Sequence, residues 1–210
     1  EYLRVAFRLW VTALRPFRFS IQCSSPTKVD VTSWRTLARR CEDLGYSTMT
    51  VSDHLDEQVG PIAALMSAAD ATTTLRVGAV VFCNDFRHPV ALAKEAATLD
   101  ALSDGRFEFG LGAGWLQTDY DRSGITLDPA SVRIARMDEA LQVIKALWTG
   151  ESVSFSGEHY RGDAWYALYG TLDDIPVFAR AGAIVPLGPR AGWGGVGNPD
   201  ELHVHVFAGA

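Results

Sequence analysis

Two kinds of run alternate along most of this chain. Short apolar runs rich in branched and aromatic residues are typical of buried β-strands, and segments with apolar residues at helical spacing follow them. The strand-like runs cover 17–23, 47–52, 75–82 and 106–111. The helix-like runs cover 32–44, 61–72, 89–102 and 130–148. Four strand–helix repeats predict parallel strands joined by right-handed crossovers, in either a barrel or an open doubly wound sheet.

The pattern changes near residues 160–168, where we expect a domain boundary. Residues 166–210 contain 8 of the 19 glycines and 4 of the 9 prolines. Short β-like runs at 177–179, 183–187 and 202–207 predict antiparallel strands rather than a fifth strand–helix unit. At the other end, a helical stripe of apolar residues within 1–16 predicts an N-terminal arm or helix. The expected organisation is therefore 1–16, 17–162 and 166–210.

Composition narrows the class of protein. The chain has 210 residues, of which 48% are hydrophobic, and a net charge of −6. This acidic balance argues against a nucleic-acid binder, and no apolar run reaches the roughly 20 residues of a membrane span. Three cysteines, Cys23, Cys41 and Cys83, form no CxxC pair. We therefore expect a globular cytoplasmic protein with neither a disulfide framework nor a cysteine metal site.

Candidate chemistry lies beyond the carboxyl ends of the strands, because parallel βα architectures bind their ligands there. The stretches that follow the four strands are 24–26, 52–54, 83–89 and 110–115. Asp53-His54 is the strongest acid–base candidate, since an imidazole titrates near neutral pH. The alternative interpretation is a polar pair that caps the next helix.

The other stretches leave two interpretations open. Gly110, Gly112 and Gly114 allow the backbone to approach a ligand closely, or they form a tight turn. Their spacing differs from the dinucleotide-binding fingerprint. Trp115 is either a flat wall for a ligand or a core anchor. Arg87 either binds an anion or makes a surface contact, and we favour the surface contact. Residues 119–121 are expected to form a polar loop that covers a site, and no metal site is predicted.

Longer motifs resemble a known family. VSDH at 51–54, the segments 85–115 and 135–150, and SFSGEHY at 154–160 are similar to the luciferase-like monooxygenase superfamily. The likeness is greatest to its deazaflavin-dependent oxidoreductases, which use coenzyme F-420. That family folds as a (β/α)8 barrel of about 250 residues. The four units counted here imply an α/β fold that is a partial TIM-type barrel.

The resemblance implies a function and a site. It implies an enzyme that transfers hydride between coenzyme F-420 or FMN and a small-molecule substrate, with His54 donating or accepting the proton. It also implies a non-prolyl cis peptide bond within 80–82, backing the cofactor ring. Around the cofactor it places Asp53, Val81, Phe82, Asn84, Gly112, Gly114 and Trp115.

Residues 166–210 resemble a different family, through IPVFARAGAIVPL and NPDELHVHVF. These motifs are similar to the C-terminal β-domain of family-31 glycoside hydrolases, the α-glucosidase group. The chain is then a chimera, and the alternative functions are a non-catalytic accessory fragment or an inactive fused scaffold. Because half a barrel has open strand edges, we expect either the tail strands to cover an edge or two copies to pair as a homodimer.

Overall fold

The computed structural model describes residues 18–23, 29–165, 177–180 and 203–207. The helices are α2 (Val31–Asp43), α3 (Pro61–Ala71), the short 3-10 helix η1 (Asn84–Phe86), α4 (Pro89–Leu102), α5 (Gln117–Ser123) and α6 (Ala130–Leu147). The strands are β1 (Arg18–Gln22), β2 (Thr48–Val51), β3 (Arg76–Ala79), β4 (Phe82–Cys83), β5 (Phe107–Gly112), β6 (Val153–Ser156), β7 (Arg161–Trp165), β8 (Val177–Arg180) and β9 (His203–Phe207). The predicted stretches 1–16, 24–26 and 183–187 lie outside the described residues.

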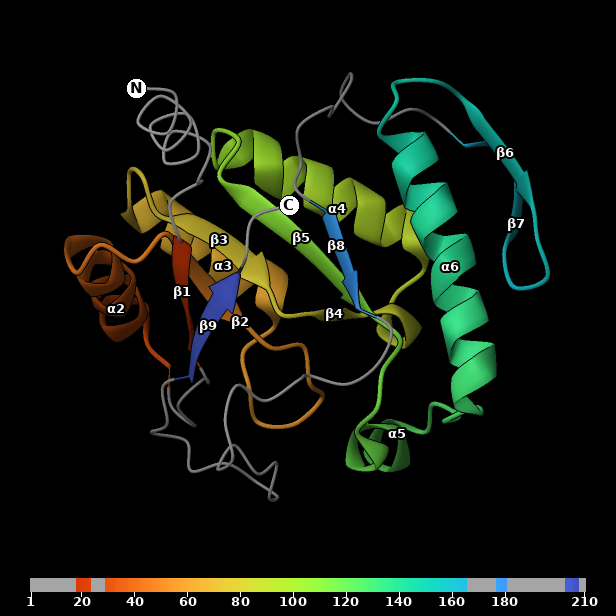
Figure 1. The fold of residues 1–210 in the computed structure, drawn as a ribbon, viewed down its shortest axis with the longest axis horizontal. Coiled ribbons are helices and arrows are strands. Elements are labelled where there is room, and N and C mark those ends of the chain that lie inside the picture. Colours follow the sequence, from red (N-terminus) through yellow and green to blue (C-terminus); the bar gives the residue numbers. More distant parts are fainter. Residues whose placement is uncertain (1–17, 24–28, 166–176, 181–202, 208–210) are drawn as a thin grey trace, which may run out of the picture.

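A parallel sheet forms the centre of the molecule (Figure 1). Strands β1, β2, β3 and β5 lie side by side in chain order, and each pair of neighbours is parallel. Every residue of β2 and β5 is buried, which fits strands covered on both faces of a parallel sheet. The strands and crossing helices therefore form the α/β arrangement of four repeats expected from the sequence.

The third predicted strand, at 75–82, is divided in two. Both β3 and β4 pair in parallel with β5, and the peptide bond between Val80 and Val81 separates them. This bond is cis. The cis peptide implied by the family resemblance is therefore present at the expected place.

Local sequence signals explain where the helices begin. Asp30 caps α2, because its carboxylate accepts the N–H groups of Thr32 and Ser33 at 2.8 and 2.9 Å. Helices α3 and α4 begin with Pro61 and Pro89, at a position where the missing N–H is not needed.

The helices that cross between strands pack on the sheet through small side chains. Alanines of α3 and α4 are completely buried, which allows close approach. They are Ala68, Ala69, Ala93, Ala96 and Ala97. Larger side chains such as Leu65 and Leu92 fill the space between, each contributing about 1.5–3 kcal/mol by burial.

Strands from the C-terminal region pair with both edges of this sheet. Strand β9 runs antiparallel to β1, with Ser20 opposite His205. Strand β8 runs parallel to β5, with Leu111 opposite Ala179. The prediction that tail strands cover an edge is confirmed. The expectation of antiparallel pairing holds for β9 but is wrong for β8, because β8 adds to β5 in the direction of the barrel strands.

Two further elements differ from the sequence prediction. Residues 117–123, expected as a polar loop in part, form helix α5, which ends at Gly124 in a left-handed conformation with φ +76°. Residues 153–165 form the antiparallel hairpin of β6 and β7 beside α6. Short polar segments such as these carry too few apolar residues for a clear periodicity.

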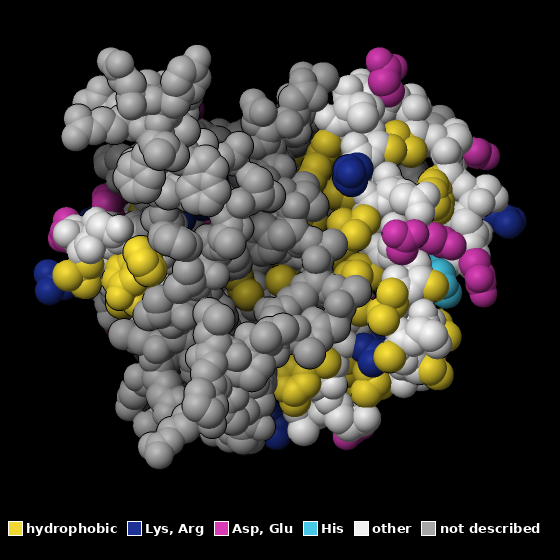
Figure 2. Space-filling view, viewed as in Figure 1, with side chains coloured by type: hydrophobic (Ala, Val, Ile, Leu, Met, Phe, Trp, Pro, Cys, Tyr) yellow, Lys and Arg dark blue, Asp and Glu magenta, His cyan; other side chains and the backbone are white. Residues whose placement is uncertain are grey.

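The distribution of charged side chains and the apolarity of the helices bear on the class of protein. On the described part of the face in Figure 2, acidic and basic side chains are dispersed among hydrophobic ones. Within the described ranges, none of the helices combines the length and the apolarity needed to cross a membrane.

Candidate functional site

The loops after β2, β4 and β5 meet at one end of the sheet, with α5 beside them (Figure 1). They carry Asp53-His54, the 84–87 segment and 113–116 respectively. Parallel strands place their carboxyl ends at the same edge, so segments distant in sequence come together there. The predicted candidates are thus gathered into one polar cluster.

Asp53 lies below the surface of this cluster, 5% exposed. Its Oδ2 accepts the N–H of Cys83 at 2.9 Å, and its two oxygens bind the two terminal nitrogens of Arg87. Burial alone would lower the pKa of Arg87, but the bonds to Asp53 and its negative charge raise it overall. Arg87 is therefore the partner of a buried carboxylate, and the favoured interpretation of a mere surface contact is wrong.

His54, the next residue, lies nearer the surface, with 22% of its side chain exposed. Its Nδ1 is 2.8 Å from Oδ2 of Asp119 on α5. The other oxygen of Asp119 accepts the N–H of Leu55 at 3.2 Å. The alternative in which Asp53-His54 caps the next helix is wrong, since Gly60 is the N-cap of α3.

Trp115 forms the exposed wall of the cluster. It is 58% exposed, so it is not a core anchor. The rings of His54 and Trp115 meet edge to face, with centroids 6.1 Å apart and an interplanar angle of 82°. A partly exposed imidazole and an exposed indole therefore lie in contact at the end of the sheet.

The two glycines before Trp115 are required by close packing within the protein. A Cβ on Gly112 would lie 2.5 Å from Cγ2 of Val81. Gly114 has φ +78°, and a Cβ there would overlap the hydroxyl of Tyr120. Their small size sets the backbone of this loop against Val81 and Tyr120, and leaves Trp115 at the surface.

A second buried carboxylate, Asp85 of η1, joins three elements. Its Oδ2 accepts the hydroxyl of Tyr120 at 2.9 Å, and its Oδ1 accepts Nη1 of Arg136 at 2.9 Å. Burial, the Cys83 thiol and Asp85 raise the pKa of the Tyr120 phenol, so it remains a donor. Burial also raises the pKa of Cys83 to about 11, which keeps this thiol protonated.

The remaining predicted residues lie at the inner side of the cluster. Phe82 is fully buried and packs on Phe109, with ring centroids 5.7 Å apart. Asn84 is 1% exposed and donates to the hydroxyl of Tyr160 at 3.2 Å. Val81 is partly exposed beside Gly112. The Phe82 ring is therefore part of the core and not of the exposed surface of the cluster.

Sequence reasoning placed Asp85 in the candidate stretch 83–89, and Asp119 and Tyr120 in a loop expected to cover a site. It assigned none of these three residues a partner or a role in the cluster. The periodicity could not show that Asp119 lies on a helix turned toward His54. In the described ranges, no group of three or more acidic, His or Cys side chains is arranged to hold a metal ion.

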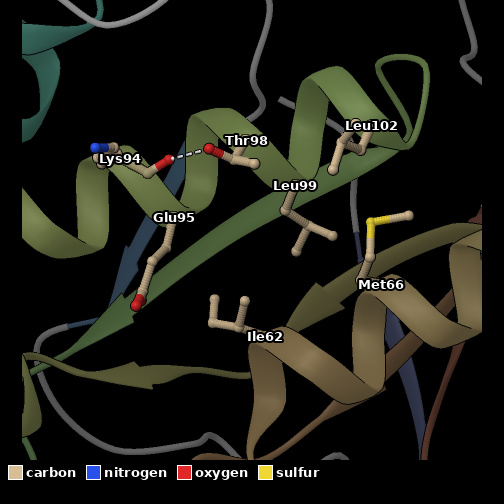
Figure 3. Close-up of a pocket in the computed structure, with 7 residues that line it drawn as sticks. All are labelled: Ile62, Met66, Lys94, Glu95, Thr98, Leu99 and Leu102. Atoms are coloured by element: carbon tan, nitrogen blue, oxygen red, sulfur yellow. Dashed lines mark hydrogen bonds between the residues drawn. The ribbon is translucent and has the colours of Figure 1, made fainter.

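A separate hollow of about 240 Å³ lies between α3 and α4 (Figure 3). Its lining is mostly apolar, with Ile62, Met66 and Leu99 pointing into it. Lys94 and Glu95 lie at its border on α4. It belongs to the helical layer and holds none of the residues of the polar cluster.

Fold and cluster together define a partial βα barrel with an imidazole at the carboxyl end of its second strand. The chain belongs to the luciferase-like monooxygenase family, whose sequence model matches residues 16–184. This match continues past the boundary expected near 160–168 and includes β8.

Known relatives support the assignment. An F420-dependent glucose-6-phosphate dehydrogenase of Amycolatopsis mediterranei is 31% identical over 158 residues, 70% of this chain and 47% of that protein. The coenzyme F420-dependent tetrahydromethanopterin reductase of Methanopyrus kandleri has a TM-score of 0.69 at 23% identity, covering 79% of this chain and 50% of that one. The 3,6-diketocamphane monooxygenase component of Pseudomonas putida, solved with FMN, has a TM-score of 0.61 at 18% identity, covering 71% and 45%. These likenesses confirm the partial TIM-type barrel.

The chain spans about half the length of the curated relatives it matches.

Proposed function

We propose that this chain contributes the first half of a flavin- or deazaflavin-dependent oxidoreductase site. The observation that carries the proposal is the pairing of His54 with Asp119 beside the exposed ring of Trp115, at the carboxyl end of the sheet. The family membership and an F420-dependent relative support it. The substrate would be a small molecule.

The residues present fit a planar redox ring. Trp115 offers an exposed aromatic surface. Gly112 packs closely against Val81, and no side chain projects from the backbone at this glycine. Trp115, Val81 and the backbone near Phe82 and Gly114 would hold such a ring. Asp53 and Asn84 would support it from below, because both side chains are buried and bonded to the protein.

The chemistry divides between cofactor and protein. Coenzyme F420 or FMN supplies hydride transfer when bound. His54 has a partly exposed ring held by a carboxylate, which suits a side chain that gives or takes a proton at the reacting substrate. The edge-to-face contact with Trp115 lies on one side of that imidazole.

A thermal melt with each cofactor tests the proposal. A ligand at 100 times its Kd stabilises the folded state by about 2.7 kcal/mol, or roughly 5–11 °C for a chain of this size. We expect coenzyme F420 or FMN to raise the melting temperature, and Trp115→Ala to reduce that rise. Leu102→Ser, at an exposed position of α4, is the matched control and should keep it. A cooperative melt that ignores both cofactors would contradict the proposal.

The predicted likeness of 166–210 to family-31 glycoside hydrolases stays a prediction, as does the join of two fragments. The relatives named above lend it no support, and no glycosidase function is proposed. Pairing of two copies at the sheet edges also stays a prediction; β8 and β9 take up both edges of the barrel strands.

A further inference from the structure

We propose that Asp119 is a positioning residue that holds His54 in its Nδ1–H tautomer and leaves Nε2 as the nitrogen that exchanges protons. The inference rests on the proposed function, because it names the reacting atom of the same site. It also assigns a purpose to α5, a helix that sequence reasoning had taken for a covering loop.

The first step is the geometry at Asp119. Its side chain is 4% exposed, and its two oxygens face the imidazole of His54 and the N–H of Leu55. A carboxylate only accepts hydrogen bonds, so the 2.8 Å contact requires a proton on Nδ1. A neutral imidazole carries one ring proton, and Nε2 is then the basic nitrogen.

The second step is the orientation of the ring. Asp119 holds the Nδ1 side, and the edge-to-face contact with Trp115 restricts the ring plane. The peptide of Leu55, bonded to the same carboxylate, fixes the backbone just after His54. Two bonds to one carboxylate therefore fix both the side chain and the loop that carries it.

The third step is the support of α5 itself. This helix has only seven residues, too few to be stable without tertiary contacts. Tyr120, adjacent to Asp119, donates to the buried Asp85, which also binds Arg136 of α6. Arg136 in turn binds Asp128. We call Tyr120, Asp85 and Arg136 the α5 brace, since together they connect this helix to η1 and α6.

The test is the tautomer of His54, read from long-range ¹H–¹⁵N spectra of the imidazoles at a pH where they are neutral. The signals of His54 are assigned with His54→Gln. We expect the intact protein to show the Nδ1–H form and Asp119→Ala to lose that preference. Asp121→Ala is the matched control, because Asp121 is exposed on the same helix and binds Gln117 instead.

The brace is tested by Tyr120→Phe, which keeps the ring against Phe86 and removes the hydroxyl that Asp85 accepts. We expect a mixed population of tautomers in this variant, and an unchanged spectrum would overturn the role of the brace. An Nε2–H form in the intact protein would overturn the proposal for Asp119 even if every variant failed to fold. So would an Asp119→Ala spectrum that matches the intact one.

The tautomer is read without any cofactor, so the two proposals fail separately. A melt that ignores both cofactors, with the Nδ1–H form present, would overturn the redox proposal and leave the role of Asp119 intact. A cofactor-dependent melt with the Nε2–H form would do the reverse.

Discussion

Arg87 and Asp53 form a bidentate ion pair at the residue that directly precedes His54. The Asp53 side chain is 2% exposed and that of Arg87 is 21% exposed, so the pair is shielded from water. Nη2 of Arg87 lies 3.0 Å from Oδ1 of Asp53, and Nη1 binds Oδ2. The pair joins the end of β2 to the segment that precedes α4.

Removal of one partner should be costly. Arg87→Met leaves an unpaired carboxylate in the interior, and we expect the free energy of unfolding to fall by about 3 kcal/mol. The double variant Asp53→Asn/Arg87→Met removes the charge as well, and should be less destabilised than the two single changes added together. Urea denaturation of all four proteins measures the coupling. Simple additivity would show that the ion pair contributes nothing of its own.

Gly114 and Gly124 provide a matched pair for testing the packing of the loop. Both have positive φ, +78° and +76°, but only Gly114 has a neighbour where a Cβ would lie. We expect Gly124→Ala to lower the free energy of unfolding by about 1–2 kcal/mol, because of its backbone conformation alone. Gly114→Ala should lower it by about 1–3 kcal/mol more than Gly124→Ala does, because the new Cβ also displaces Tyr120. Equal losses in thermal or urea melts would mean that the loop moves aside freely.

The hydrogen bonds of the Glu42 carboxylate should make the stability of the protein depend on pH. Its carboxylate accepts the N–H groups of Thr73, Thr74 and Leu75, and these bonds outweigh burial and lower its pKa to about 2. Because the folded pKa is below the unfolded one, the contribution is complete above about pH 4.5 and is lost as the pH falls toward 2.

We therefore expect Glu42→Gln to lower the free energy of unfolding by about 1 kcal/mol at pH 7, and by less at pH 3. Urea melts at both pH values measure this difference. Asp43→Asn, at the exposed neighbouring position, serves as the control. A loss that is the same at pH 7 and pH 3 would exclude the carboxylate charge as its cause.

The three cysteines should be unreactive in the folded protein. Cys23, Cys41 and Cys83 are 2%, 2% and 6% exposed, and burial raises the pKa of Cys83 to about 11. The hydrogen bond with Cys23 lowers the pKa of Cys41, so the protection of Cys41 rests on its burial. Thiol reagents attack the thiolate, so a disulfide dye at pH 8 should label the native protein slowly. All three should react at once in denaturant. Rapid labelling of one thiol without denaturant would show that its region opens readily.

Periodicity in the sequence was enough for the framework of the fold. The helix predicted at 89–102 is α4 to the residue, and the runs 32–44 and 130–148 match α2 and α6 within one or two residues. These segments are long, and Asp30 or a proline in the sequence indicates where each helix begins. The position of His54 at a strand end followed from the same pattern, because the topology of parallel strands places ligand sites there.

The tertiary structure alone decided the partners within the site. Asp119 is 65 residues from His54 and Arg87 is 34 from Asp53, and no local pattern encodes such pairs. The direction of β8 was likewise set by the free edge of β5, not by its own short sequence. Local propensity and hydrophobic spacing act over a few residues and so determine elements and their ends. Which side chains meet depends on how the assembled sheet brings the loops together.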